Sequence, residues 1–122
     1  MLLYVKDGSG IGRYEVVEGQ EDATIQDRSG TVAAGGTAQA FLAANPSSDS
    51  AVGRSGWFLQ NNSSAALVVN ILGTAGPGAG VVVAAGQTAG TLEGAAVRLP
   101  LTTGAVSIYG GTNGQAFAGL EW

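Results

Sequence analysis

The alternation of hydrophobic and polar positions gives the first structural information about this chain. In residues 106–109, Val106 and Ile108 fall on the same face of an extended strand, and in the last segment Phe117 and Glu121 lie on the face opposite Leu120. A period of two residues is typical of β-strands that have one buried face. The pattern therefore predicts an all-β chain with Val106 and Ile108 in its core.

Turn-forming clusters rich in Gly, Asn, Ser and Pro separate seven such β-favouring runs beyond Gly30. The predicted strands are residues 37–43, 56–60, 66–72, 80–84, 96–101, 106–109 and 117–121. Residues 38–44 are rich enough in Ala for a short helix, but Gly36 and Pro46 bound the stretch, and we assign it to a strand. Strands at this spacing predict a compact antiparallel β-sandwich.

Two of these runs, residues 67–69 and 81–83, are hydrophobic without alternation. A strand of this kind is covered on both faces. We expect either a second sheet or a neighbouring subunit to provide the cover.

Charge divides the chain near Ser29 and Gly30. Residues 1–28 contain six of the nine acids and three of the five bases, and the other 94 residues carry five charges. Two extended pieces, residues 2–5 and 13–17, flank a Gly-rich turn at residues 8–12. We predict an N-terminal docking arm or hairpin over residues 1–28 and a β-sandwich domain over residues 29–122.

The low charge content indicates that part of the surface is covered by other subunits. Charged residues make up 11% of the chain, compared with roughly 25% in typical soluble domains. A net charge of −4 with five Lys and Arg argues against a nucleic-acid partner. The longest apolar run, residues 65–72, is too short for a transmembrane helix, and residues 1–5 do not form a signal peptide. The sequence thus predicts a homo-oligomer with no nucleic-acid or membrane partner.

The absence of certain side chains restricts catalysis. The chain has no His and no Cys, which excludes Ser-His-Asp triads, thiol nucleophiles and the usual zinc sites. Only carboxylate pairs drawn from Asp49, Glu93 and Glu121 remain for glycosidase-like chemistry, and we interpret these acids as solvated turn or edge charges. We therefore predict no enzymatic activity and assign no catalytic, cofactor-binding or metal-binding residue.

Arginines and aromatic residues provide the interface candidates. Arg54 and Arg98 are the only bases after residue 28, and each is able to anchor a buried or intersubunit ion pair with Asp49, Glu93 or Glu121. Core packing explains most aromatic side chains. Trp122, the last residue, is the exception, and we treat it as an interface candidate. The residues assigned as interface candidates are Tyr4, Tyr14, Arg54, Trp57, Arg98 and Trp122.

Several segments resemble a family of small virion β-domains from tailed bacteriophages. They are GGTAQAFLAANP at residues 35–46, RSGWFLQNNSS at 54–64, VNILGTA at 69–75, AGQ at 85–87 and AVSIYGGTNGQAF at 105–117. The resemblance covers roughly residues 30–122 and leaves residues 1–28 outside. It implies a virion-associated β-sandwich of the head-decoration, head-fibre or appendage type, without catalytic residues or cofactors.

On this basis we expect a non-enzymatic virion structural protein, assembled in the host bacterial cytoplasm. The favoured role is a capsid decoration (cement) or head-fibre-like protein that binds the major capsid protein or another virion protein as a homotrimer, docking through residues 1–28. The alternative is a carbohydrate-binding or host-adhesion module of a tail appendage, which would recognise a host glycan through Trp57, Tyr109 or Trp122 exposed together.

Overall fold

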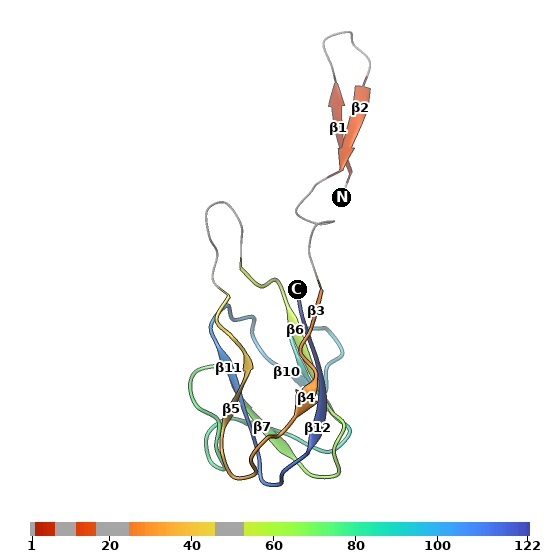
Figure 1. Cartoon of the computed structure of the whole chain (residues 1–122). Helices are drawn as coiled ribbons and strands as arrows, with labels where there is room; N and C mark the ends of the chain where they lie inside the picture. Colours follow the sequence, from red (N-terminus) through yellow and green to blue (C-terminus); the bar gives the residue numbers. More distant parts are fainter. Residues whose placement is uncertain (1, 7–11, 17–24, 46–52) are drawn as a thin grey trace.

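The computed structural model describes residues 2–6, 12–16, 25–45 and 53–122, with side chains described for the last two ranges. Within these ranges the chain contains strands and no helix, as the sequence predicts. Two sheets face each other as a β-sandwich (Figure 1). The six-stranded sheet consists of β3 (Gln26–Asp27), β4 (Gly30–Thr31), β6 (Trp57–Asn61), β9 (Thr88–Gly90), β10 (Val97–Arg98) and β12 (Ala116–Glu121). The four-stranded sheet consists of β5 (Gln39–Leu42), β7 (Leu67–Asn70), β8 (Val81–Val83) and β11 (Val106–Gly110).

The two sheets are almost entirely antiparallel. The six-stranded sheet has the order β10-β9-β6-β12-β3, and β4 also pairs with β12. The four-stranded sheet has the order β5-β11-β7-β8, so β5 and β8 are its outer strands. Only β9 and β10 pair in parallel among the strands described.

Alternating burial explains why these segments form the sandwich. Buried and partly buried residues alternate along β6 and β11, and Val106 and Ile108 are fully buried, which confirms the prediction from their spacing. Phe41 of β5 lies edge-on to both Trp57 and Phe117, with ring centroids 6.1 Å and 5.7 Å apart. Aromatic rings from both sheets thus meet in the core, where each buries a large apolar area.

All seven strands predicted from the sequence are present, although most are shorter than expected. The segment at residues 38–44 is indeed a strand, β5. Three further strands, β3, β4 and β9, were not predicted, because each has only two or three residues and too little sequence to establish a period. They become strands by pairing with β12 and β6, which are long and buried.

The two non-alternating hydrophobic runs differ in their burial. In β7, Leu67, Val68 and Val69 are all buried, as expected for a strand covered on both faces. In β8, only Val83 is buried, whereas Val81 and Val82 are 40% and 56% exposed. The sandwich therefore covers β8 only at Val83, and β8 has no strand partner on its outer side among the described residues.

The N-terminal strands β1 (Leu2–Lys6) and β2 (Gly12–Val16) form an antiparallel two-stranded sheet of their own, in agreement with the predicted hairpin. The connecting residues 7–11 and the following residues 17–24 lie outside the described ranges. The sandwich itself starts upstream of the boundary expected at Ser29, because β3 pairs with the end of β12.

Candidate functional site

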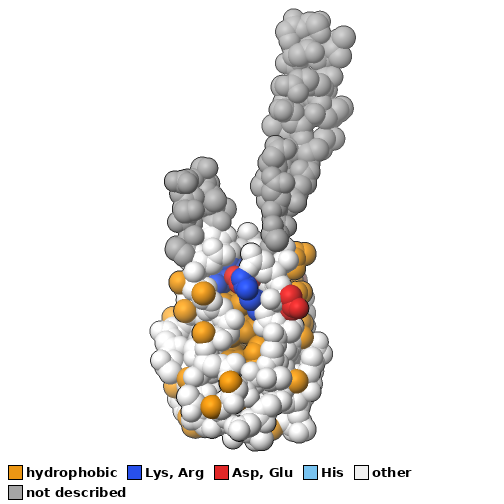
Figure 2. Space-filling view, viewed as in Figure 1, with side chains coloured by type: hydrophobic (Ala, Val, Ile, Leu, Met, Phe, Trp, Pro, Cys, Tyr) orange, Lys and Arg blue, Asp and Glu red, His pale blue; other side chains and the backbone are white. Residues whose placement is uncertain are grey.

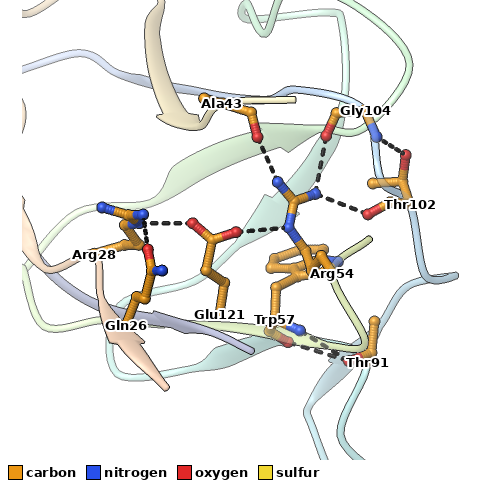
Figure 3. A network of polar contacts seen from close by, with 9 residues as sticks. All are labelled: Gln26, Arg28, Ala43, Arg54, Trp57, Thr91, Thr102, Gly104 and Glu121. Carbon is orange, nitrogen blue, oxygen red and sulfur yellow. Dashed lines mark hydrogen bonds and ion pairs between the residues drawn. The ribbon is translucent and has the colours of Figure 1, made fainter. Parts of the chain in front are cut away.

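A buried ion-pair network lies where β6 begins and β12 ends (Figure 3). Nε of Arg54 donates to Oε1 of Glu121 at 3.0 Å, and Nε of Arg28 donates to Oε2 at 2.6 Å. The side chains of Arg54 and Glu121 are 0% and 6% exposed, whereas that of Arg28 is 42% exposed. The Glu121 carboxylate therefore bridges two guanidinium groups, that of Arg54 inside the sandwich and that of Arg28 at its surface.

Arg54 also joins the two sheets through main-chain carbonyls. Its Nη1 donates to the carbonyl oxygens of Thr102 at 2.7 Å and Gly104 at 2.9 Å, and its Nη2 donates to that of Ala43. Ala43 follows β5, and Thr102 and Gly104 precede β11. Four of the five N–H groups of the Arg54 guanidinium therefore have an acceptor within the protein.

The electrostatics of Glu121 follow from this geometry. Burial raises the pKa of its carboxyl group, but hydrogen bonds and charge interactions with Arg28 and Arg54 lower the pKa by more, to below its ordinary value of 4.5. Glu121 is consequently an ionised structural group, and its carboxylate is not available as a proton donor at neutral pH.

The interpretation of the three acids as solvated turn or edge charges is wrong for Glu121, which is buried because two arginines pair with its carboxylate. Glu121 is engaged by two arginines, Glu93 is exposed on the segment between β9 and β10, and Asp49 lies outside the described residues. A reacting pair would need two carboxyl groups that face one substrate. The ion pairs with Arg28 and Arg54 occupy the Glu121 carboxylate, so it does not face a substrate as one member of such a pair.

The predicted interface residues are distributed over several places. Arg54 forms the buried pair with Glu121 that the sequence analysis allowed for, and Trp57 is 0% exposed in the core, so neither side chain is accessible to a second subunit. Tyr4 and Tyr14 are opposite each other in the register of the N-terminal hairpin, with their side chains outside the described residues. Arg98 is exposed and Trp122 is partly exposed, and both line one pocket.

The three aromatic residues considered for glycan recognition do not form a single platform. Trp57 is buried, Tyr109 belongs to β11 in the four-stranded sheet, and Trp122 follows β12 in the other sheet. Their separation reflects the sandwich topology, which places neighbouring segments of sequence on different layers.

An uncharged apolar surface surrounds the outer strand β8. We define the β8 edge surface as Leu72, Val81, Val82, Leu99 and Pro100; Leu72 is 93% exposed. A pocket of about 450 Å³ lies among Leu72, Val81, Leu99 and Pro100. Residues 55–92, which include β6, β7, β8 and β9, contain no charged side chain. Figure 2 shows the same contrast, with charged groups gathered at one end of the sandwich and the rest of the visible face uncharged.

The main-chain groups on the outer side of β8 have no described strand partner, since β8 pairs only with β7. Soluble proteins usually protect such edges with a charge, a Pro, a bulge or a covering loop. β8 is short, with three residues, which itself limits edge pairing, but its valines provide no charge and no Pro.

Sequence reasoning missed two parts of these sites. Arg28 was grouped with the N-terminal arm because it ends the charged segment, and nothing in the linear sequence shows that it binds Glu121. The exposure of Leu72 was not predicted, because Leu72 ends a hydrophobic run and was assigned to a strand. The following Gly73 is a turn signal, and it could have indicated that Leu72 lies at the surface.

Comparison with known proteins identifies no relative of this chain. No protein-family model, curated protein or solved structure matches it. Within the described ranges no helix is long and apolar enough to cross a membrane.

Proposed function

We propose that this chain is a non-enzymatic structural protein of a tailed-bacteriophage virion, of the capsid-decoration or head-fibre type, which self-associates through its β8 edge surface. The observation that carries the proposal is the exposed, uncharged outer strand β8 beside Leu72. The phage assignment is supported by the sequence resemblance over residues 30–122. A structural role is also supported by Glu121, whose carboxylate is held by two arginines.

A second copy of the chain is the proposed occupant of the β8 edge surface. Neither β8 nor the other outer strand of its sheet, β5, contains a charged residue, so a contact between the two strands meets no like-charge repulsion. The strand order β5-β11-β7-β8 makes β8 and β5 run in opposite directions, because each successive pair is antiparallel. The β8 strand of one copy is therefore able to pair antiparallel with β5 of the next.

This head-to-tail contact is of the heterologous kind that closes into a ring when the rotation permits. It buries the apolar edge and satisfies main-chain groups of β8 by strand addition. A ring of three agrees with the trimer expected from the sequence.

Substitution of Val82 by lysine tests the contact. In light scattering at micromolar concentration, we expect the wild-type protein to have a mass of about 36 kDa, three times the 12.0 kDa chain. V82K places a charge in the paired edge, whose desolvation is unfavourable, and should shift the population to the single-chain mass. Thr112→Lys adds the same charge in the exposed β11–β12 turn and should leave the mass unchanged. A wild-type protein that stays monomeric at these concentrations would contradict the proposal.

Deletion of residues 1–24 tests the docking role of the N-terminal hairpin. The cut leaves β3 and Arg28 in place, so the sandwich and its ion pairs are retained. We expect the truncated protein to keep its oligomeric mass but to lose saturable binding to phage particles that lack the protein, measured by co-sedimentation. Binding at an unchanged copy number would show that the hairpin does not dock the protein.

A further inference from the structure

A pocket at one end of the six-stranded sheet combines an aromatic ring, a cation and apolar side chains. Its volume is about 500 Å³, and we define the Trp122 pocket by its lining residues, which are Ser55, Thr91, Leu92, Arg98, Leu99, Pro100, Leu101 and Trp122. The strand order explains why these side chains lie close together. The starts of β6 and the ends of β9, β10 and β12 all lie at this end of the sheet.

The Trp122 ring is held in place by its neighbours. The main-chain N–H and C=O groups of Gly56 both bond to the main chain of Trp122, and Ser55 N–H donates to the same main-chain oxygen. The indole lies so close to Gly56 that a Cβ atom there would collide with the ring. Trp122 nevertheless stays partly exposed, so a fixed aromatic surface lines the pocket.

Arg98 is the cation of this pocket. The sandwich residues described contain three arginines, and both Arg28 and Arg54 bind Glu121. The Arg98 guanidinium makes no ion pair or hydrogen bond with the described residues, and no acidic side chain lines the pocket. A planar guanidinium in this state is suited to two-point binding of a carboxylate.

The rest of the lining indicates the shape of the ligand. Leu92 and Leu101 are 42% and 50% exposed, so the pocket is a shallow depression open to solvent. The exposed Ser55 adds a hydroxyl group that is able to donate and accept hydrogen bonds. A ligand that fits must present an apolar face to the indole and leucines, a negative group to Arg98 and hydroxyl groups at its rim.

We propose that the Trp122 pocket binds an acidic sugar residue of a polysaccharide or glycan, a uronic or sialic acid. The apolar C–H face of the sugar ring lies on the indole, and its carboxylate pairs with Arg98. This site adjoins the β8 edge surface, because Leu99 and Pro100 line both pockets. Its proposed ligand contacts are Arg98 and Trp122, which lie outside the β8 edge surface, so neither proposal depends on the other. It also differs from a three-aromatic platform, since Trp122 is the one tryptophan that reaches the pocket.

Tryptophan fluorescence of the full chain provides the test, because Trp57 is 0% exposed and Trp122 is the partly exposed tryptophan. The probes are tetragalacturonate and sialyllactose. Their neutral counterparts are fully methyl-esterified tetragalacturonate and lactose, and acetate serves as a carboxylate without a sugar. We expect saturable emission changes with at least one acidic probe, with a Kd on the order of 0.1–1 mM for such an open site.

The neutral counterpart should bind at least about tenfold more weakly, because it lacks the charge-assisted hydrogen bonds to Arg98. Arg98→Gln should weaken binding of the acidic probe to a similar extent, and Trp122→Phe should reduce the affinity measured by calorimetry. Thr112→Ala, an uncharged change in the exposed β11–β12 turn at the opposite end of β12, should leave the affinity unchanged.

Several results would overturn this assignment. They are the absence of saturable binding by both acidic probes up to about 10 mM, equal binding of the esterified probe, an equal response to acetate, or unchanged affinity in Arg98→Gln. Failure of V82K to alter the oligomeric mass would leave the sugar site untouched, so the two proposals fail separately.

Discussion

Replacement of Arg54 by methionine is expected to lower the free energy of unfolding by about 3–5 kcal/mol at pH 7. The substitution leaves the buried Glu121 carboxylate with only the half-exposed Arg28 as its charged partner. It also removes the donors to the carbonyls of Ala43, Thr102 and Gly104. Urea unfolding followed by fluorescence measures the change.

Arg98→Met is the matched control, because it removes an arginine that is exposed and makes no contact of this kind. We expect its free energy of unfolding to stay within about 0.5 kcal/mol of the wild-type value. Equal effects of R54M and R98M would mean that the buried network does not stabilise the fold.

The effect of Arg54→Met should also depend on pH. The pKa of Glu121 is lowered in the folded state, so its contribution to stability is present above the unfolded-state pKa, near 4.5, and is lost as the pH falls through the folded-state pKa. The difference between wild type and R54M should therefore narrow as the pH is lowered from 7 to below 4.5. Asp27, whose pKa is lowered by hydrogen bonds from Ser29, is present in both proteins and cancels in this comparison.

Substitution of Gly90 by alanine is expected to destabilise the sandwich by about 3 kcal/mol or more. Gly90 has a φ of +152°, and a Cβ atom there would overlap the main-chain oxygen of Trp57 and lie 2.9 Å from the Cα of Phe58. Both neighbours are backbone atoms of the central strand β6, which cannot move aside without disturbing the β6–β9 pairing. Thermal and urea unfolding of Gly90→Ala measure the loss.

Gly86→Ala separates steric overlap from backbone conformation. Gly86 has a φ of +79°, but a Cβ atom there would meet nothing within 4 Å. Its substitution should cost only about 1 kcal/mol, the penalty of a non-glycine residue in the left-handed region. Equal losses in the free energy of unfolding for G90A and G86A would show that the close approach of β9 to β6 is not the reason for the glycine at position 90.

Arg54 and Gly90 lie in the same part of the fold. Arg54 lies three positions before the first residue of β6, and Gly90 pairs with Phe58 near the start of the same strand. The buried ion pair and the close β6–β9 contact therefore both act at the end of the sheet where the Trp122 pocket is formed. Variants of either residue should be checked for folding before their sugar binding is interpreted.

Much of the fold could be predicted from the sequence because its causes are local. The period of two residues in 106–109 and 117–121 identifies strands, since side chains alternate across any extended backbone. The same period places Phe117 and Glu121 on one face, and the structure buries both. With few charges in the chain, Glu121 was already among the three available partners of Arg54.

Tertiary structure alone decided the features that depend on distant segments. β3, β4 and β9 are too short to carry a period and exist through pairing with longer strands. The choice of Glu121 as the partner of Arg54, and the recruitment of Arg28, depend on β6 and β12 being neighbours.

The same applies to the surfaces on which function depends. The three valines of β8 are alike in sequence, yet the tertiary structure buries Val83 in the core and leaves Val81 and Val82 exposed on an outer strand. Arg98 and Trp122 are 24 positions apart. They share a pocket because β10, which ends at Arg98, and β12, which Trp122 follows, both terminate at the same end of the sheet, on either side of the β9–β6 pair. Local sequence thus determined the seven predicted strands, whereas their order in the two sheets determined the three short strands, which side chains meet and which are left exposed.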